Sequence, residues 1–160
     1  MTKTETYEYL SKQHIRYEVT EHKAVYHMGE LEGAALPYPD LNAKNLFVRD
    51  DKKRNYYLIS IRGDKHLKLK EFEKQNHLRR LSFASEEDLM RMMKLVPGEV
   101  TPLGLLNDEE RIIQFYLDQS FCGGMVGVHP NDNTATVWIN ADDLIQLVQK
   151  HGNPVHVIAI

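Results

Sequence analysis

The sequence has one cysteine and no long apolar run, and both features narrow the class of protein. With Cys122 as its single cysteine, the chain can form no internal disulfide and no cysteine-rich metal site. No stretch approaches the roughly 18 apolar residues that a membrane-spanning helix needs. Residues 1–5 contain no apolar core of the kind that signal peptides carry. We therefore expect a cytoplasmic protein that does not associate with membranes.

Several familiar chemical motifs are also missing. The sequence contains neither a GxxxxGK[ST] loop nor a GxGxxG fingerprint, so it offers no standard cradle for nucleotide phosphates. Eight histidines invite a metal hypothesis, but none of them falls in an HExxH or HxH pattern. We therefore predict that the protein uses no cofactor and no metal.

The composition is that of an ordinary globular chain, but its charge is unevenly distributed. Hydrophobic residues make up 42% and charged residues 27% of the 160 residues, which predicts a single domain over 1–160. The net charge is −3, yet residues 44–80 hold 12 Lys/Arg and 5 Asp/Glu, a local balance of +7. Such a stretch is either one side that faces a polyanion or an ordinary lysine-rich surface.

Capping and periodicity predict five helices. Thr2 and Glu5 have the spacing of a capping box, as do Ser85 and Asp88 before a second apolar stripe. Asn140 is placed to cap the last helix, and Gly152 to close it. The predicted helices begin or lie at 5–13, 28–36, 68–76, after Ser85 and after Asn140. Between them, residues 96–104 hold two prolines and two glycines, which predicts an irregular shaped loop.

Strands outnumber helices and arrive partly as hairpins. Residues 44–50 and 56–61 flank a polar turn, and residues 125–129 and 134–139 flank the turn Pro130–Asn133. The other predicted strands are 15–20, 81–83, 111–117 and 155–160. These elements predict an α+β protein with a mixed, largely antiparallel sheet and peripheral helices.

Three features are hard to explain by packing alone. Lys44 and Asn45 stand at the entry of a strand that should be buried, where an unpaired cation is costly. The loop 98–102 would present rigid backbone groups to a ligand, and His129 ends a strand before a turn. Each feature by itself also has a structural explanation, since most lysines are simply solvated.

Together and in this order, the three features resemble the YbaK/ProX editing domains, which also occur as the insertion domain of bacterial prolyl-tRNA synthetases. The matching segments are KNLFVRD at 44–50, GEVTP at 98–102 and GVHP at 127–130. The resemblance covers essentially the whole chain, and no synthetase body is attached. It implies a YbaK-like sheet or barrel and a freestanding editing protein.

The resemblance also implies a reaction and roles for particular residues. The reaction is hydrolysis of the ester in mischarged Ala-tRNA(Pro), which yields alanine and free tRNA(Pro). Lys44, Asn45 and His129 would be the catalytic residues, with Lys44 as a substrate anchor and His129 as a positioning group. Five residues would bind the amino acid and its ester: Gly98, Thr101, Pro102, His27 and Met28. In the family a proline often stands near Lys23 and a threonine near His27, so this departure bears on substrate specificity.

The partner implied is the acceptor end of a mischarged tRNA. Four basic residues are candidates for gripping its phosphates: Lys65, Lys68, Arg79 and Arg80. Docking on prolyl-tRNA synthetase is a further implication, and we expect a monomer. Two alternatives stay open: a deacylase for Cys- or Ser-tRNA, and a non-catalytic tRNA-binding or regulatory module of the same fold.

Overall fold

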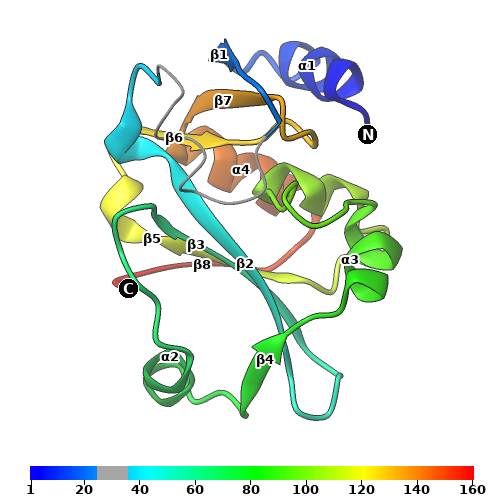
Figure 1. The fold of residues 1–160 in the computed structure, drawn as a ribbon, viewed down its shortest axis with the longest axis vertical. Helices are drawn as coiled ribbons and strands as arrows, with labels where there is room; N and C mark the ends of the chain where they lie inside the picture. The colour runs from blue at the N-terminus through cyan, green and yellow to red at the C-terminus, as the bar shows by residue number, and fades with distance from the viewer. Residues whose placement is uncertain (25–35) are drawn as a thin grey trace.

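Two β-sheets of different size form the centre of the structure (Figure 1). The computed structural model describes residues 1–24 and 36–160. The small sheet has the strand order β1-β7-β6 and consists of β1 (Tyr17–Glu21), β6 (Met125–Val128) and β7 (Ala135–Asn140). The large sheet has the order β4-β2-β3-β5-β8 and consists of β2 (Ala43–Asp50), β3 (Tyr56–Arg62), β4 (Leu81–Phe83), β5 (Gln114–Asp118) and β8 (Val155–Ile158).

The strand directions confirm a mixed, largely antiparallel arrangement. In the small sheet, β7 pairs antiparallel with both of its neighbours. In the large sheet, β2 pairs antiparallel with β3 and β4, whereas β3–β5 and β5–β8 are parallel. Across the described residues the strands make two open sheets and not a closed barrel.

The predicted hairpin at the centre of the large sheet is confirmed. Its turn is held by the carboxylate of Asp50, which accepts hydrogen bonds from the backbone N–H of Arg54 and from Asn55 Nδ2 at 2.9 and 2.8 Å. Strands β2 and β3 then pair in a regular register that sets Lys44 opposite Ile61 and Asn45 opposite Ser60.

Among the described residues, the α-helices lie where the sequence predicts them. They are α1 (Lys3–Lys12), α2 (Leu69–Gln75), α3 (Glu86–Met93) and α4 (Ala141–His151), and side-chain caps begin α1, α3 and α4 but not α2. Thr2 and Glu5 form the predicted capping box, Ser85 caps α3, and Asn140 caps α4. Gly152 closes α4 with φ of 115°, a left-handed conformation that favours glycine. Short 3-10 helices form η2 (Pro39–Leu41), η3 (Pro102–Asn107) and η4 (Gln119–Phe121).

Two predicted elements need correction. The segment 96–104 is irregular only as far as Thr101, because Thr101 caps the 3-10 helix η3, which begins at Pro102. The strand predicted from Arg111 begins at Gln114, because Arg111 adopts a left-handed φ of 58° and its side chain donates to the carbonyl of His151. The helix predicted for residues 28–36 lies almost wholly outside the described residues.

The two faces of the large sheet bury separate cores. Phe47 of β2 belongs to a core that joins the large sheet, the small sheet, α3, α4 and η3. Val48, its neighbour in β2, belongs to a second core beneath α2. Because successive strand residues point to opposite faces, this alternation fixes the face on which every other β2 side chain lies.

Candidate active site

The small sheet has one face in the main core and a second face that carries polar groups. Val137 and Ile139 of β7 enter the main core, so Thr136 and Trp138 lie on the opposite side, here called the outer face. Trp138 Nε1 donates to Thr20 Oγ1 of β1 at 2.9 Å across this face. The Trp138 ring also covers Gly127, where an added Cβ would approach ring carbon Cζ3 to 2.4 Å. Gly127 is therefore required by the close approach of the indole.

A backbone bridge between the two sheets orients Lys44 and His129 toward the same face. Asn42 pairs with Gly127 in parallel orientation, although the two residues belong to different sheets. Two positions further along each segment stand Lys44 and His129. Since paired positions of parallel segments share a face, the bridge directs both residues toward the outer face of the small sheet.

Lys44 and Asn45 project to opposite sides of β2. Asn45 shares its face with Ala43 and Phe47, and its Oδ1 accepts a hydrogen bond from Ser60 Oγ at 2.5 Å. Lys44 shares the other face with Leu46, is half-buried, and bonds to no residue in the described part of the chain. The ammonium of Lys44 is therefore available to an anionic ligand, whereas the oxygen of Asn45 is engaged within the fold.

The His129 imidazole is held in one orientation. Its Nδ1 lies 2.9 Å from the carbonyl oxygen of Ala135, which can only accept, so Nδ1 carries the proton. Burial lowers the pKa of His129 below the ordinary histidine value. The hydrogen bond to Ala135 and the charge of Asp132 act in the opposite direction, while His22 lowers the pKa further. The ring is therefore neutral near pH 7, and its Nε2 is a hydrogen-bond acceptor without a partner among the described residues.

Thr101 ties the predicted ligand loop to the His129 turn. The fully buried Thr101 hydroxyl donates to the carbonyl oxygen of His129 at 2.6 Å and accepts from the N–H of Leu103 at 3.3 Å. Pro102 is buried at the start of η3, and Gly98 turns the loop with a left-handed φ of 91°. The structure thus brings two of the three sequence features into direct contact, through backbone and a buried side chain.

Comparison with known proteins identifies the family. The sequence profile of the aminoacyl-tRNA editing domain matches residues 22–147. The chain belongs to the aminoacyl-tRNA editing domain family. It is therefore a hydrolase that deacylates aminoacyl-tRNA, with mischarged tRNA as substrate.

Individual relatives agree with this placement. The chain is 38% identical over 152 residues to the prolyl-tRNA editing protein ProX of Acetoanaerobium sticklandii, covering 94% of this chain and 93% of the relative. It is 33% identical over 144 residues to prolyl-tRNA synthetase associated domain-containing protein 1 of Mus musculus, covering 87% and 85% of the two chains. A solved structure described as a candidate trans-editing enzyme for prolyl tRNA synthetase matches with a TM-score of 0.73. That match covers 100% of this chain and 98% of the other at 20% identity, and it confirms the fold. The resemblance read from the motifs is confirmed.

The predicted phosphate-gripping residues of the editing domain differ in how far their charges are already engaged. Lys65 Nζ lies 2.7 Å from the buried Asp118 carboxylate and 3.1 Å from the carbonyl oxygen of Ile160. Arg79 makes two hydrogen bonds to the Asp51 carboxylate, at 2.7 and 3.1 Å. Lys68 is exposed, and its Nζ lies 3.8 Å from Glu71 Oε1. Arg80 is also exposed and has no partner in the described part of the chain.

Two further polar residues of the outer face, His22 and Thr136, were not predicted from the sequence. Their side chains are hydrogen-bonded to each other, and the His22 ring faces the His129 ring. A signal was available: Glu18, Thr20 and His22 continue one alternation past the predicted end of the first strand. The predicted pocket residues His27 and Met28 lie outside the described residues.

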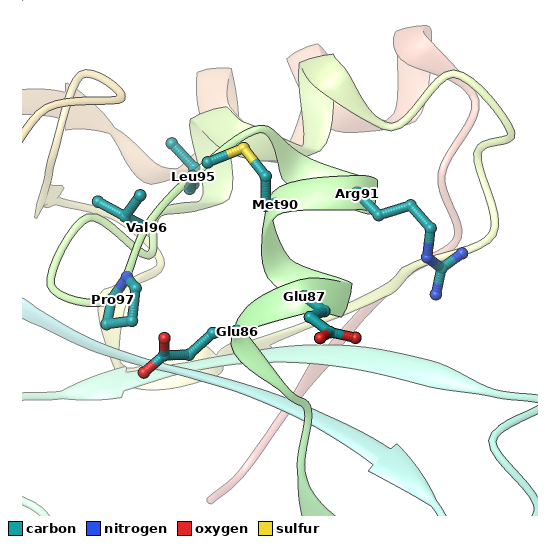
Figure 2. A pocket seen from close by; sticks show the side chains of 7 residues that line it. All are labelled: Glu86, Glu87, Met90, Arg91, Leu95, Val96 and Pro97. Atoms are coloured by element: carbon teal, nitrogen blue, oxygen red, sulfur yellow. The ribbon is translucent and has the colours of Figure 1, made fainter.

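A separate surface pocket of about 490 Å³ lies beside the loop (Figure 2). Glu86, Glu87, Met90 and Arg91 of α3 line it together with the segment 95–97, which leads directly into Gly98. The carboxylates of Glu86 and Glu87 make this pocket a poor site for a phosphate. Within residues 1–24 and 36–160, no three His, Cys, Asp or Glu side chains gather as a metal site. No described helix is long and apolar enough to cross a membrane.

Proposed function

We propose that this protein is a trans-editing deacylase that hydrolyses Ala-tRNA(Pro) to alanine and free tRNA(Pro). The observation that carries the proposal is the half-buried Lys44, which has no partner among the described residues, on the same face as a neutral His129 whose carbonyl is anchored by the 98–102 loop. The 38% identity to a prolyl-tRNA editing protein over 94% of the chain supports the choice of tRNA.

The need for such an enzyme follows from the limits of binding selectivity. A pocket shaped for proline cannot strongly exclude the smaller alanine, because a missing methylene changes binding by only about 1–3 kcal/mol. A second site that admits alanine and excludes proline by steric clash selects in the stronger direction. The loop 98–102 suits such a wall, since Thr101 and Pro102 are buried and fix its end.

The reaction assigns different work to Lys44 and His129. A water molecule attacks the ester carbonyl, the carbonyl carbon–O3′ bond breaks, and the released 3′ oxygen takes up a proton. The ammonium of Lys44 holds the terminal nucleotide and stabilises the negative charge that develops on the ester oxygen. His129 Nε2 accepts a hydrogen bond from the attacking water or from the ribose 2′-hydroxyl and so positions it.

The remaining predicted site residues support these two. Asn45 acts from the inner face of β2, where its bond to Ser60 stiffens the strand entry that carries Lys44. Gly98 and Thr101 shape the loop that bounds the ester and the amino group. His27 and Met28 are proposed to border the amino-acid pocket.

We propose that the acceptor stem of the tRNA binds along β2. In Figure 1, α2 and β4 lie at the end of the molecule opposite α1 and β1, with β2 running between the two ends. Lys68 and Arg80, on either side of α2, are placed to contact acceptor-stem phosphates while the 3′ end reaches Lys44. The other two candidates, Lys65 and Arg79, already form ion pairs with the carboxylates of Asp118 and Asp51. We further propose that residues 1–160 act as one domain, as a monomer in the cytoplasm, on tRNA supplied by prolyl-tRNA synthetase.

The first test removes the Lys44 ammonium. Lys44→Ala should lower kcat/KM for Ala-tRNA(Pro) at least about 100-fold, the scale seen when one charge-stabilising donor is lost. Lys52→Ala, which removes an exposed lysine of the hairpin turn, is the matched control and should retain the parental rate. Parental hydrolysis by a cooperatively folded Lys44→Ala variant would show that the site has been assigned wrongly.

A further inference from the structure

His22 is built into the outer face of the small sheet although it follows the last residue of β1. Its backbone N–H donates to the carbonyl oxygen of Thr134 at 2.9 Å, which extends the β1–β7 ladder by one residue. The half-buried imidazole places Nδ1 2.8 Å from the carbonyl oxygen of Lys23 and Nε2 2.9 Å from Thr136 Oγ1. Both ring nitrogens are therefore engaged.

These contacts fix the orientation of the His22 ring. A carbonyl oxygen can only accept, so Nδ1 donates to Lys23, while Nε2 is hydrogen-bonded to the hydroxyl of Thr136. Thr136 is fully buried, so its hydroxyl can serve only as a partner within the fold. Because both ring nitrogens and the buried hydroxyl have hydrogen-bond partners, the ring is held at a fixed angle.

The fixed His22 ring packs edge-on against His129, with ring centroids 6.1 Å apart and an interplanar angle of 60°. Both rings are oriented by consecutive residues of β7, because Ala135 supplies the carbonyl for His129 and Thr136 the hydroxyl for His22. One strand therefore aligns the two imidazoles, and contact with the His22 ring restricts the movement of His129.

The charges around His129 come from two directions. His22 lies against His129 from the end of β1 and lowers the pKa of His129. Asp132, in the turn after β6, has the opposite influence, but its carboxylate is occupied by the N–H and hydroxyl of Thr134. Lys3 binds the same Thr134 hydroxyl, and Glu99 of the loop lies near enough to Asp132 to feel its charge.

We infer that His22 is a positioning residue for the editing reaction, which holds the His129 imidazole in place with its Nε2 directed at the substrate. This inference rests on the proposed function, because it assigns His129 to the reacting water or 2′-hydroxyl. Thr136 supports this role, because its hydroxyl fixes the orientation of the His22 ring. Neither residue needs to touch the substrate.

The kinetic test uses a substitution that keeps bulk and hydrogen bonding. His22→Gln should lower kcat for Ala-tRNA(Pro) about tenfold, a modest part of the loss that misplacement of a reacting group can cause. KM should stay within about twofold, and the acid limb of the kcat profile should move to higher pH. Thr136→Val should cause a smaller fall in kcat, and the double variant should lose less than the two single losses combined, because the residues act as one unit.

A second measurement does not depend on activity. In the proton NMR titration of His129, His22→Gln should raise the midpoint, because the His22 ring no longer opposes protonation of His129. His151→Gln is the matched control: His151 is also half-buried, is bonded through Nδ1 to Asn153 at the C-terminal end of α4, and should leave the His129 midpoint unchanged.

The outcomes separate the inference from the proposed function. A parental kcat, a fall confined to KM, or an unchanged His129 midpoint in His22→Gln overturns the positioning role. If the parent protein deacylates none of the mischarged tRNAs, the proposed function fails, while the midpoint still reports whether His22 controls His129.

Discussion

Thr101 shows how one hydroxyl can organise a site without touching the substrate. It is fully buried, donates to the carbonyl of His129 and accepts from the N–H of Leu103, so both of its hydrogen-bonding functions serve the fold. The sequence marks Thr101 as part of a ligand loop. The structure adds that its side chain fixes the distance between this loop and the histidine turn.

Replacing Thr101 by valine should therefore weaken both stability and catalysis. Thr101→Val leaves the buried carbonyl of His129 without its donor, which should lower the free energy of unfolding by about 1–3 kcal/mol. Deacylation should fall as well, since His129 is no longer held against the loop. Urea denaturation and single-turnover deacylation measure the two effects.

Thr101→Ser is the matched control because it keeps the hydroxyl and removes only a methyl group. It should cost about 1 kcal/mol or less and retain most of the activity. Equal losses in the serine and valine variants would assign the role of Thr101 to packing and not to the hydrogen bond.

At the scale of elements, Asp118 joins the end of β5 to three other segments. The carboxylate is fully buried and accepts from Lys65 Nζ and from the N–H groups of Arg62 and Ser120. Burial alone would raise the pKa of Asp118, but these donors more than offset it and hold the pKa below the ordinary value. Lys65 also reaches the carbonyl of Ile160, so the cluster ties down the C-terminal segment after β8.

Removing Lys65 should destabilise the large sheet. Lys65→Ala leaves a buried carboxylate without its cation, which should lower the free energy of unfolding by about 3 kcal/mol at pH 7. The deficit relative to the parent should shrink as the pH falls below about 4, because a depressed carboxyl pKa stabilises only while the group is ionised. Lys70→Ala, which removes an exposed lysine of α2, is the control and should change stability little. A Lys65→Ala variant as stable as this control would contradict the structural role.

The sequence predicts elements well where the signal is local. Thr2, Ser85 and Asn140 cap the helices that their spacing indicates, and the hairpin 44–50/56–61 follows from two apolar runs around a polar turn. The start of β5 is not predictable in this way, because Arg111 leaves the strand region to reach His151, 40 residues away. The 3-10 helix η3 is not predicted, because proline and glycine usually end a regular helix. Here Thr101 caps a 3-10 helix whose first residue is Pro102.

The sequence predicts which residues form the site, but not how they contact one another. The motifs single out Lys44, Thr101 and His129, but the Asn42–Gly127 bridge that orients the first and the last toward one face joins two different sheets and is not visible in the sequence. The ion pair of Lys65 with Asp118 spans 53 residues, so composition alone counts Lys65 among the free charges. The role of His22 depends on Thr136, 114 residues away.

At the scale of the whole molecule, the positive charge of residues 44–80 is partly compensated within the fold. Lys65 and Arg79 are paired with carboxylates, whereas Lys68 and Arg80 remain exposed near α2. The surface that can meet a polyanion is therefore smaller than the count of basic residues indicates.

The salt dependence of tRNA binding tests this division. The Lys68→Ala, Arg80→Ala double variant should reduce the slope of log K against log salt by about 0.7–0.9 for each phosphate that the protein no longer neutralises. The control is Lys12→Ala, Arg16→Ala, which removes the same two charge types from exposed positions outside the basic stretch. Identical slopes for the two double variants would place the tRNA grip elsewhere.

The most direct measurement for the whole account is the rate at which the parent protein deacylates Ala-, Cys-, Ser- and Pro-tRNA(Pro). We predict that Ala-tRNA(Pro) is hydrolysed fastest and Pro-tRNA(Pro) at least about tenfold more slowly, as expected when one extra ring is excluded by a steric wall. Faster turnover of the cysteinyl or seryl species would move the activity to another small residue. Binding of tRNA(Pro) without hydrolysis of any of the four, or equal rates for alanine and proline, would contradict the proposed editing of Ala-tRNA(Pro).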